Sequence, residues 1–333
     1  MPMPAQSDLH VNAPLTNVSV AYIQDNRRFL ATRVFPQVKV EKQSDLYWKY
    51  SKSDWRRTDA ARRAPSTETP GVGWSTTTDQ YFAHVYGVHK DIDDQLRANA
   101  DSNFHLDSDA TKFVTNQLLL KRDIDWAARY FVTGAWGTEY TGVSTGPTAG
   151  QFLQWDQAAS TPLGDSTDWF DSFDTLTGFP VNKLVLGTDV WKALKNHPEI
   201  LDRIKYTQKG VVTEQLVAEF FGVDDVIIAK ATKATGPQIA DAAAQDAAAT
   251  YDRIVSPKNA LAVYAPSSPS LLQPSAGYTF VWNGLIGAGG GEGIRIKNFR
   301  MEQIASDRIE AEMTYDQKIV SPDCGIFFND VVA

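Results

Sequence analysis

The sequence is nearly free of cysteine, because Cys324 is the only one among 333 residues. A single cysteine cannot form an intrachain disulfide, which favours a reducing compartment and argues against a small secreted domain stapled by disulfides. Cys324 could be a reactive thiol, but the apolar residues at 326–328 favour a buried structural cysteine.

Long apolar runs are also missing. No segment approaches the roughly 18 consecutive apolar residues that a membrane-spanning helix needs. The first eight residues, MPMPAQSD, do not lead from a basic segment into an apolar one, as a signal peptide does. We therefore expect neither export nor insertion into a membrane.

An excess of positive charge is absent as well. The net charge is −8, so we expect no strong overall attraction to nucleic acid, and any such binding must come from a local patch. The 43% hydrophobic and 22% charged residues are typical of a soluble globular protein with about two domains.

Catalytic signatures are weak. Residues 142–146, GVSTG, match the G-x-S-x-G pattern of serine hydrolases, in which a strand precedes and a helix follows the nucleophile. Here Pro147 and Gly150 follow and open no helix, and His197 is the only histidine downstream of Ser144. A flexible loop is the favoured interpretation, and a hydrolase using Ser144 is kept as an alternative.

Cofactor and metal signatures are also weak. The glycine-rich residues 287–293 lack the Lys-Ser/Thr of a phosphate loop, and His84 and His89 would point to opposite faces of a strand. The acids at 91–94 lack the glycine and distant glutamate of a calcium loop and instead predict a helix start. We expect no enzyme activity and no catalytic, cofactor or metal site.

The most informative segment is residues 45–90. Leu46, Trp48 and Tyr50 alternate with polar neighbours as in a strand, and residues 81–89 form a return run rich in aromatic and β-branched residues. The stretch between them is long, polar and rich in proline and glycine, so it cannot bury enough surface to fold alone. Long loops held between strands are usually functional, which predicts an arm that lies on another molecule. Self-assembly is therefore the first hypothesis.

That arm carries a local basic patch. A guanidinium group suits phosphates and carboxylates equally, but the acidic remainder of the chain favours carboxylates of a neighbouring subunit. The candidate subunit-interface residues are Arg56, Arg57, Arg62 and Arg63.

The rest of the chain divides by pattern. Residues 1–44 look extended, with a short helix possible at 18–29, and Pro36 prohibits a central strand at 34–40. An apolar repeat from Phe113 to Phe131 predicts a long helix over 107–133 that stops at Gly134. Residues 176–285 alternate between strands and helices, as in one α+β unit. Residues 293–305 and 308–320 predict a long antiparallel hairpin with its turn at Ser306 and Asp307.

Four segments together resemble the major capsid proteins of tailed bacteriophages, and the resemblance covers residues 15–328. The segments are FPQVKVEKQSD at 35–45, IDDQLRANA at 92–100, ILDRIKY at 200–206 and QPSAGY at 273–278. The resemblance implies the α+β Hong Kong 97-type capsid fold. It places an N-terminal arm at 1–44, an extended loop at 45–90, a peripheral domain at 91–175 with its spine helix at 107–133, an axial domain at 176–285, and returning peripheral strands at 286–333.

The resemblance also implies a function. The chain would self-assemble as pentamers and hexamers into an icosahedral head that encloses double-stranded DNA without sequence specificity, in the cytoplasm of the host cell. The expected partners are a portal, a maturation protease, a decoration protein and a separate scaffolding protein, the last because residues 1–44 are too short for a built-in scaffold. Lys49 and Lys52 lie back from the loop tip, which argues against covalent crosslinks. The alternatives are an encapsulin-like cargo shell, a tail or decoration protein, and the Ser144 hydrolase.

Overall fold

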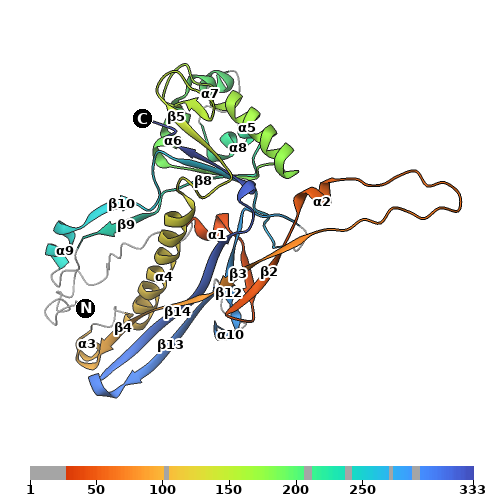
Figure 1. Ribbon diagram of the computed structural model, residues 1–333. Helices are drawn as coiled ribbons and strands as arrows, with labels where there is room; N and C mark the ends of the chain where they lie inside the picture. Colours follow the sequence, from red (N-terminus) through yellow and green to blue (C-terminus); the bar gives the residue numbers. More distant parts are fainter. Residues whose placement is uncertain (1–27, 101–104, 206–211, 237–241, 270–272, 287–292) are drawn as a thin grey trace.

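A computed structural model describes residues 28–100, 105–205, 212–236, 242–269, 273–286 and 293–333 (Figure 1). These ranges leave out most of the helix expected at 18–29. They also leave out the glycine-rich segment 287–293 except for its last residue. Two β-sheets form the body, with one long helix beside the first and several short helices around the second. Among the described residues, no helix is both long and apolar enough to span a membrane.

The first sheet has five strands. They are β1 (Gln37–Val40), β4 (His84–Asp93), β12 (Gly277–Trp282), β13 (Ile294–Met301) and β14 (Ser306–Ile319). The central strand β14 pairs antiparallel with β4, β12 and β13 along its length. The short helices α3 (Asp94–Asn99) and α10 (Asn283–Ile286) follow β4 and β12.

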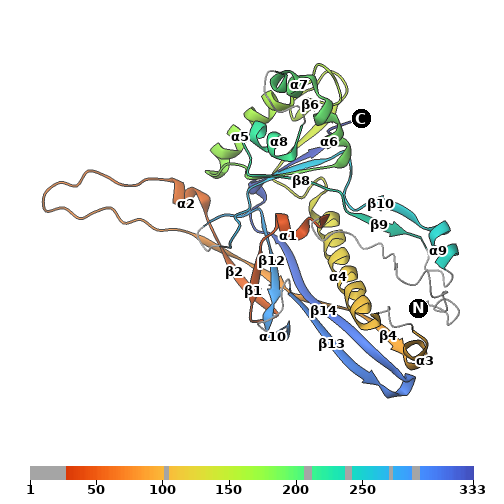
Figure 2. The same cartoon turned by 180° about the vertical axis from the view of Figure 1, so that it is seen from behind.

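The long helix α4 (Leu106–Tyr130) lies across this sheet, and Figure 2 shows the same arrangement from behind. Its existence was predicted. The predicted apolar repeat is right at its end, where Ala127 and Phe131 are buried, but wrong at its start, where Phe113 is 51% exposed and the neighbouring Val114 is fully buried. The buried face also contains the polar residues Arg122 and Asp123, which a search for apolar side chains at helical spacing passes over.

The second sheet has six strands in the order β6-β5-β15-β11-β7-β8. They are β5 (Thr138–Val143), β6 (Gln151–Leu153), β7 (Lys183–Leu186), β8 (Asp225–Ile228), β11 (Ala260–Val263) and β15 (Gly325–Asn329). This sheet crosses the limits of the unit expected at 176–285. It takes in β5 and β6 before that segment and β15 after it, whereas β12 pairs in the first sheet.

Short helices surround the second sheet, and a β-ribbon projects away from it (Figure 1). The helices are α5 (Pro162–Thr177), α6 (Thr188–Asn196), α7 (Pro198–Ile204), α8 (Glu214–Phe221) and the 3₁₀ turn η5 (Pro322–Cys324). The strands β9 (Thr232–Thr235) and β10 (Thr250–Arg253) form a separate ribbon with helix α9 (Ala242–Ala248) between them. Pro198 lies in the first turn of α7, where proline is favoured, and Gly222 ends α8 with a φ of 66°.

The last part of the expected N-terminal arm packs into the core of its own subunit. Helix α1 (Ala31–Val34) and the following Phe35 are core elements, and the ring of Phe35 contacts Trp126 and Tyr130 at centroid distances of 5.8 and 5.1 Å. Pro36 precedes the edge strand β1, where its missing N–H is tolerated.

The hairpin of β13 and β14 also needs a correction at its turn. The turn is the 3₁₀ segment η4 (Glu302–Ile304) followed by Ala305, whose φ is 45°, and β14 already begins at Ser306. The Ser306 hydroxyl donates to the carbonyl of Ile304, and the carbonyl of Ala305 accepts the N–H of Asp94. These contacts to the preceding residues and to α3 place the turn four residues earlier than the sequence suggested.

The predicted hairpin at 45–90 is divided between two structures. Strands β2 (Ser44–Tyr50) and β3 (Thr76–Phe82) form a two-stranded antiparallel ribbon, whereas β4 belongs to the first sheet. The predicted return run at 81–89 is therefore wrong as a single strand, because the backbone changes partner at the buried Ala83. The ribbon also has something to pack on, since Tyr47 and Tyr81 contact the ring of Phe280.

Candidate subunit interface

The loop at residues 51–75 extends from the β2–β3 ribbon away from the body, on the side opposite the β9–β10 ribbon (Figures 1 and 2). It begins with the short helix α2 (Lys52–Arg56). Every residue from 55 to 78 is exposed. An extended segment of this length with no contact surface beyond its base is suited to lie on another molecule.

The structure does not gather the four predicted interface arginines at one point. Arg56 donates to the carbonyl oxygens of Thr175 and Leu176 at the end of α5. The other three arginines lie further along the loop. Arg57 pairs with Asp59, and Arg63 donates to the carbonyl of Thr67. Arg62 has no hydrogen bond or ion pair to the residues that the structure describes.

The loop also carries apolar side chains that our sequence reasoning missed. Trp55 lies between Tyr50 and Trp74, and these two tryptophans and Val72 are all more than half exposed. They line a cleft of about 530 Å³ between the two arms of the loop. The available signal was the presence of two tryptophans in an otherwise polar segment, a composition that favours contact surfaces.

One face of the ribbon is apolar and uncovered. Leu46 is 59% exposed, Trp48 65% and Phe82 46%, while the alternate residues Tyr47 and Tyr81 face the first sheet. Exposed apolar patches of this kind are typical of protein contact sites. The ribbon therefore has one face packed on its own subunit and one face free to receive another.

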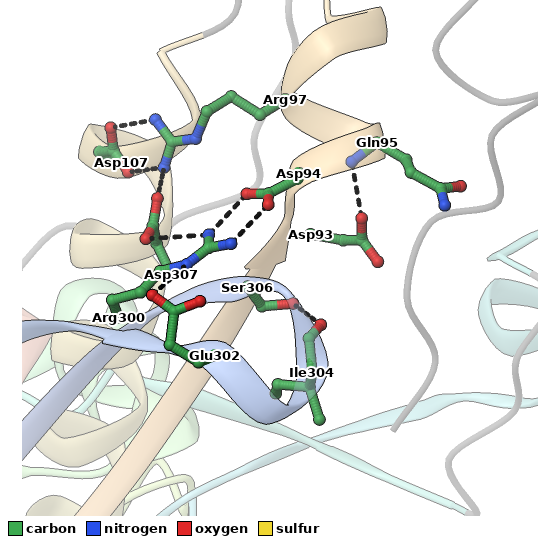
Figure 3. A network of polar contacts seen from close by, with 10 residues as sticks. All are labelled: Asp93, Asp94, Gln95, Arg97, Asp107, Arg300, Glu302, Ile304, Ser306 and Asp307. Atoms are coloured by element: carbon green, nitrogen blue, oxygen red, sulfur yellow. Dashed lines mark hydrogen bonds and ion pairs between the residues drawn. The ribbon is translucent and has the colours of Figure 1, made fainter.

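A network of ion pairs connects the tip of the β13–β14 hairpin to α3 and α4 (Figure 3). Arg300 binds both carboxylate oxygens of Asp94, and Arg97 binds Asp107 and Asp307. Hydrogen bonds from these arginines hold the pKa of the Asp94 and Asp107 carboxyls below the usual value.

The acids at 91–94 are therefore engaged in pairing and capping. Asp91 pairs with Arg308, Asp94 pairs with Arg300, and the Asp93 side chain accepts the N–H of Gln95 as the N-cap of α3. The predicted helix start is confirmed. Within the described ranges, no cluster of three or more His, Cys, Asp or Glu residues could hold a metal ion.

Ser144 does not sit in a nucleophile elbow. It is exposed after strand β5, and the chain continues through turns into β6 without a helix. The first glycine of the motif has a packing reason, because a Cβ atom on Gly142 would lie 2.1 Å from the carbonyl oxygen of Asp330. The last glycine, Gly146, has a φ of 59°, which side chains disfavour.

His197 is occupied in a structural contact. Its Nδ1 atom accepts the backbone N–H of Glu199, so its Nε2 atom carries the proton and donates to the buried Ser160 hydroxyl at 3.0 Å. A general base must instead accept the proton of a serine hydroxyl. Burial further lowers the pKa of His197 and raises that of the buried Cys324 thiol.

Comparison with known proteins points to one class. Residues 153–250 match the family described as phage major capsid protein E. The major capsid protein of Burkholderia phage BcepMu is 28% identical over 225 residues, covering 66% of this chain and 69% of that protein. The major capsid protein of Pseudomonas phage JBD67 is 24% identical, with 97% of both chains covered.

Solved structures share the fold. A phage-related protein from Bordetella bronchiseptica RB50 superposes with a TM-score of 0.67 at 16% identity over 91% of this chain and 92% of that one. The capsid of cyanophage P-SCSP1u gives 0.57 at 13% identity, covering 97% and 93% of the two chains. An encapsulin from Synechococcus elongatus PCC 7942 gives 0.53 at 9% identity, covering 97% and 94%.

The encapsulin likeness shows the fold alone, whereas the family match and both curated relatives are phage capsid proteins. Together with the shared capsid fold, they identify this chain as a phage major capsid protein with the Hong Kong 97-type fold, a structural component of the virion.

Proposed function

We propose that copies of this chain assemble as pentamers and hexamers into an icosahedral head that encloses double-stranded DNA. One observation carries the proposal: the ribbon and loop at 44–82 extend from the body and present Leu46, Trp48 and Trp74 to solvent. Covering these side chains with another copy removes apolar surface from water at about 25 cal/mol per Å². A closed shell repeats each such contact, so individually weak contacts suffice.

The division into capsid domains is part of the proposal. Residues 1–44 are the arm, 45–90 the extended loop, 91–175 and 286–333 the peripheral domain, and 176–285 the axial domain. The two sheets support this division in outline, with the five-stranded sheet and α4 at the peripheral centre and the six-stranded sheet at the axial centre. β5, β6 and β15 then complete the axial sheet, and β12 completes the peripheral one.

Arg56, Arg57, Arg62 and Arg63 are proposed to serve the contact with an acidic surface of the adjacent subunit. Arg62 carries the most weight, because its guanidinium has no partner among the described residues. We expect Arg62→Ala with Arg63→Ala to lower the assembly yield and its dependence on salt. The matched control is Lys192→Ala with Lys195→Ala on α6, which removes the same charge from two exposed positions. Equal yields from the two double variants would contradict this role.

The remaining partners follow from the same proposal. A separate scaffolding protein, a portal, a maturation protease and a decoration protein would act on the shell, assembly would take place in the host cytoplasm, and the chain itself would have no catalytic activity, cofactor or metal. The loop tip carries no lysine between residues 53 and 75, which supports a shell without covalent crosslinks from this loop.

The test is sedimentation velocity of the purified chain with and without its candidate scaffolding protein, followed by electron microscopy of the fast fraction. Closed particles of uniform size are the expected result, and a chain that stays monomeric in both conditions would refute the proposal. Nuclease-protected DNA in particles from infected cells supports a phage head, whereas a protein cargo would support an encapsulin-like shell.

A further inference from the structure

The loop is ordered by contacts at the point where it leaves the body. We call residues 50–56 and 74–76 the neck. The Asp54 carboxylate accepts the backbone N–H and the hydroxyl of Ser75 at 2.7 and 2.6 Å. The Trp55 ring lies 6.1 Å from that of Tyr50 and 6.0 Å from that of Trp74. These contacts join the outgoing and returning arms, so the neck behaves as one unit.

Arg56 connects the neck to the end of helix α5. Its guanidinium donates to the carbonyl oxygens of Thr175 and Leu176, each at 2.8 Å. It also lies 3.7 Å from the place where a Cβ atom would stand on Gly178, the left-handed residue that ends the helix. The last carbonyls of a helix lack partners within it and form the negative end of its dipole, so a cation is stabilised there.

Helix α5 provides no such cation itself. Its 16 residues contain four aspartates and no basic residue, and Asp174 adds a negative charge in the last turn. Arg56 supplies the missing charge from 120 positions earlier in the chain. The end of α5 therefore favours a guanidinium from the neck.

Lys52 makes a second contact at the other end of α2. Its Nζ atom lies 2.5 Å from Oδ2 of Asp323 in η5, just before β15 of the second sheet. Below the neck, the ribbon rests on the first sheet, where the rings of Tyr81 and Phe280 stack at 4.6 Å. The base of the loop thus contacts the first sheet and also α5 and η5, which lie beside the second sheet.

We propose that Arg56 and Lys52 are positioning residues that hold the neck against α5 and η5 in the unassembled subunit, so that the loop points in a fixed direction before a neighbour arrives. Because the ribbon rests on the first sheet and the neck on α5 and η5 beside the second, a change in the angle between the two sheets would turn the loop. The inference rests on the proposed function, since a preset direction has consequences only if the loop reaches another copy.

Hydrogen exchange on the unassembled subunit tests the positioning directly. We expect Arg56→Gln with Lys52→Gln to raise the exchange rates of the neck amides of Ser51 and Ser75 about fivefold, because local opening then lacks two charged contacts. The control is Lys192→Gln with Lys195→Gln on α6, which removes the same two positive charges from exposed positions outside the neck. Equal neck exchange in the Arg56/Lys52 and Lys192/Lys195 variants would overturn the proposal.

A charge reversal separates positioning from a general loss of stability. Lys52→Asp and Asp323→Lys should each raise neck exchange, and the two together should restore the wild-type rate. Arg56→Lys should restore part of the protection, because an ammonium keeps the charge but loses the two-pronged geometry. If the reversed pair exchanges as fast as either single variant, Lys52 is not a positioning residue.

Assembly kinetics then test the consequence. Light scattering after addition of the scaffolding protein should show an assembly lag lengthened about fivefold in the Arg56/Lys52 variant, because fewer subunits present the loop correctly. The Lys192/Lys195 variant should keep the wild-type lag. Faster neck exchange with an unchanged lag would overturn the positioning role and leave the proposed function intact. A wild-type chain that never assembles would overturn both.

Discussion

Asp123, near the middle of α4, accepts a hydrogen bond from the backbone N–H of Leu30 through its Oδ1 atom at 2.7 Å. The same oxygen accepts the N–H of Ala31, also at 2.7 Å. These are N–H groups at the start of helix α1, which has no side-chain cap of its own. A carboxylate 93 residues away therefore caps the helix and fixes it to the core.

The Asp123 contact should make stability depend on pH. Burial raises the pKa of its carboxyl from 3.8 to about 6. Between about pH 4 and pH 6 the folded chain thus holds a proton that the unfolded chain has released, so the contribution of Asp123 to the free energy of unfolding falls as pH rises. Asp123→Asn keeps an acceptor and cannot ionise. Relative to wild type, the free energy of unfolding of this variant should rise by about 3 kcal/mol between about pH 4 and pH 7, as measured by urea titrations. A difference that is independent of pH would contradict this.

Removing the acceptor altogether should be costly. Asp123→Ala leaves the N–H groups of Leu30 and Ala31 buried without their partner, which should lower the free energy of unfolding by about 2–5 kcal/mol. Asp168→Ala on the exposed face of α5 is the control and should change it by no more than about 0.5 kcal/mol. Chemical denaturation of both variants measures the difference, and similar losses would show that the cap is unimportant.

Substitutions of Gly142 and of Ser144 in the G-x-S-x-G segment should differ in their effect on stability. Gly142→Ala places a methyl group against the backbone oxygen of Asp330 and should lower the melting temperature, at a cost of about 2–3 kcal/mol. Ser144→Ala removes an exposed hydroxyl and should leave both melting temperature and assembly unchanged. Labelling of the wild-type chain by a serine-directed probe, lost in Ser144→Ala, would instead indicate a hydrolase.

The Asp91–Arg308 pair should stabilise the sheet at neutral pH. The side chains of Asp91 and Arg308 are 19% and 20% exposed. The Nε and Nη2 atoms of Arg308 donate to the two carboxylate oxygens of Asp91 at 2.7 and 2.8 Å. Arg308 lowers the pKa of Asp91, so its contribution is present above the unfolded pKa of about 4 and is lost as pH falls through the lower folded value. Asp91→Asn should therefore cost about 1 kcal/mol at neutral pH and nothing in strong acid.

The control for that pair is Asp45→Asn, which breaks the exposed pair with Lys42. Surface pairs of this kind contribute little, so the loss should be clearly smaller than that at Asp91. Unfolding free energies measured at neutral and acid pH decide the matter. A loss at Asp91 that persists in strong acid would mean that the side chain acts by packing and not by charge.

Local signals were sufficient for several elements. Asp93 as the cap of α3, Pro198 in the first turn of α7 and Gly222 after α8 were all predictable, because each depends on backbone preferences within one turn of helix. The long helix and the two strands of the final hairpin also followed from their apolar spacing.

Partner choice was not predictable from these patterns. The run at 81–89 suits a strand throughout, yet Phe82 donates its backbone N–H to the Asp316 carboxylate and the chain then joins β14 at His84. Likewise Arg56 resembles the other loop arginines in sequence, but the end of α5 takes it up. Both outcomes depend on groups more than a hundred residues away.

Composition and periodicity within short windows were enough to predict a globular chain with a rod-like helix, a separate α+β portion and a basic loop between strands. Which strands share a sheet, where the loop is anchored and why Arg122 and Asp123 are buried became visible only in the folded chain. Those choices depend on long-range pairing and on burial of polar groups beside specific partners, which no local spacing encodes.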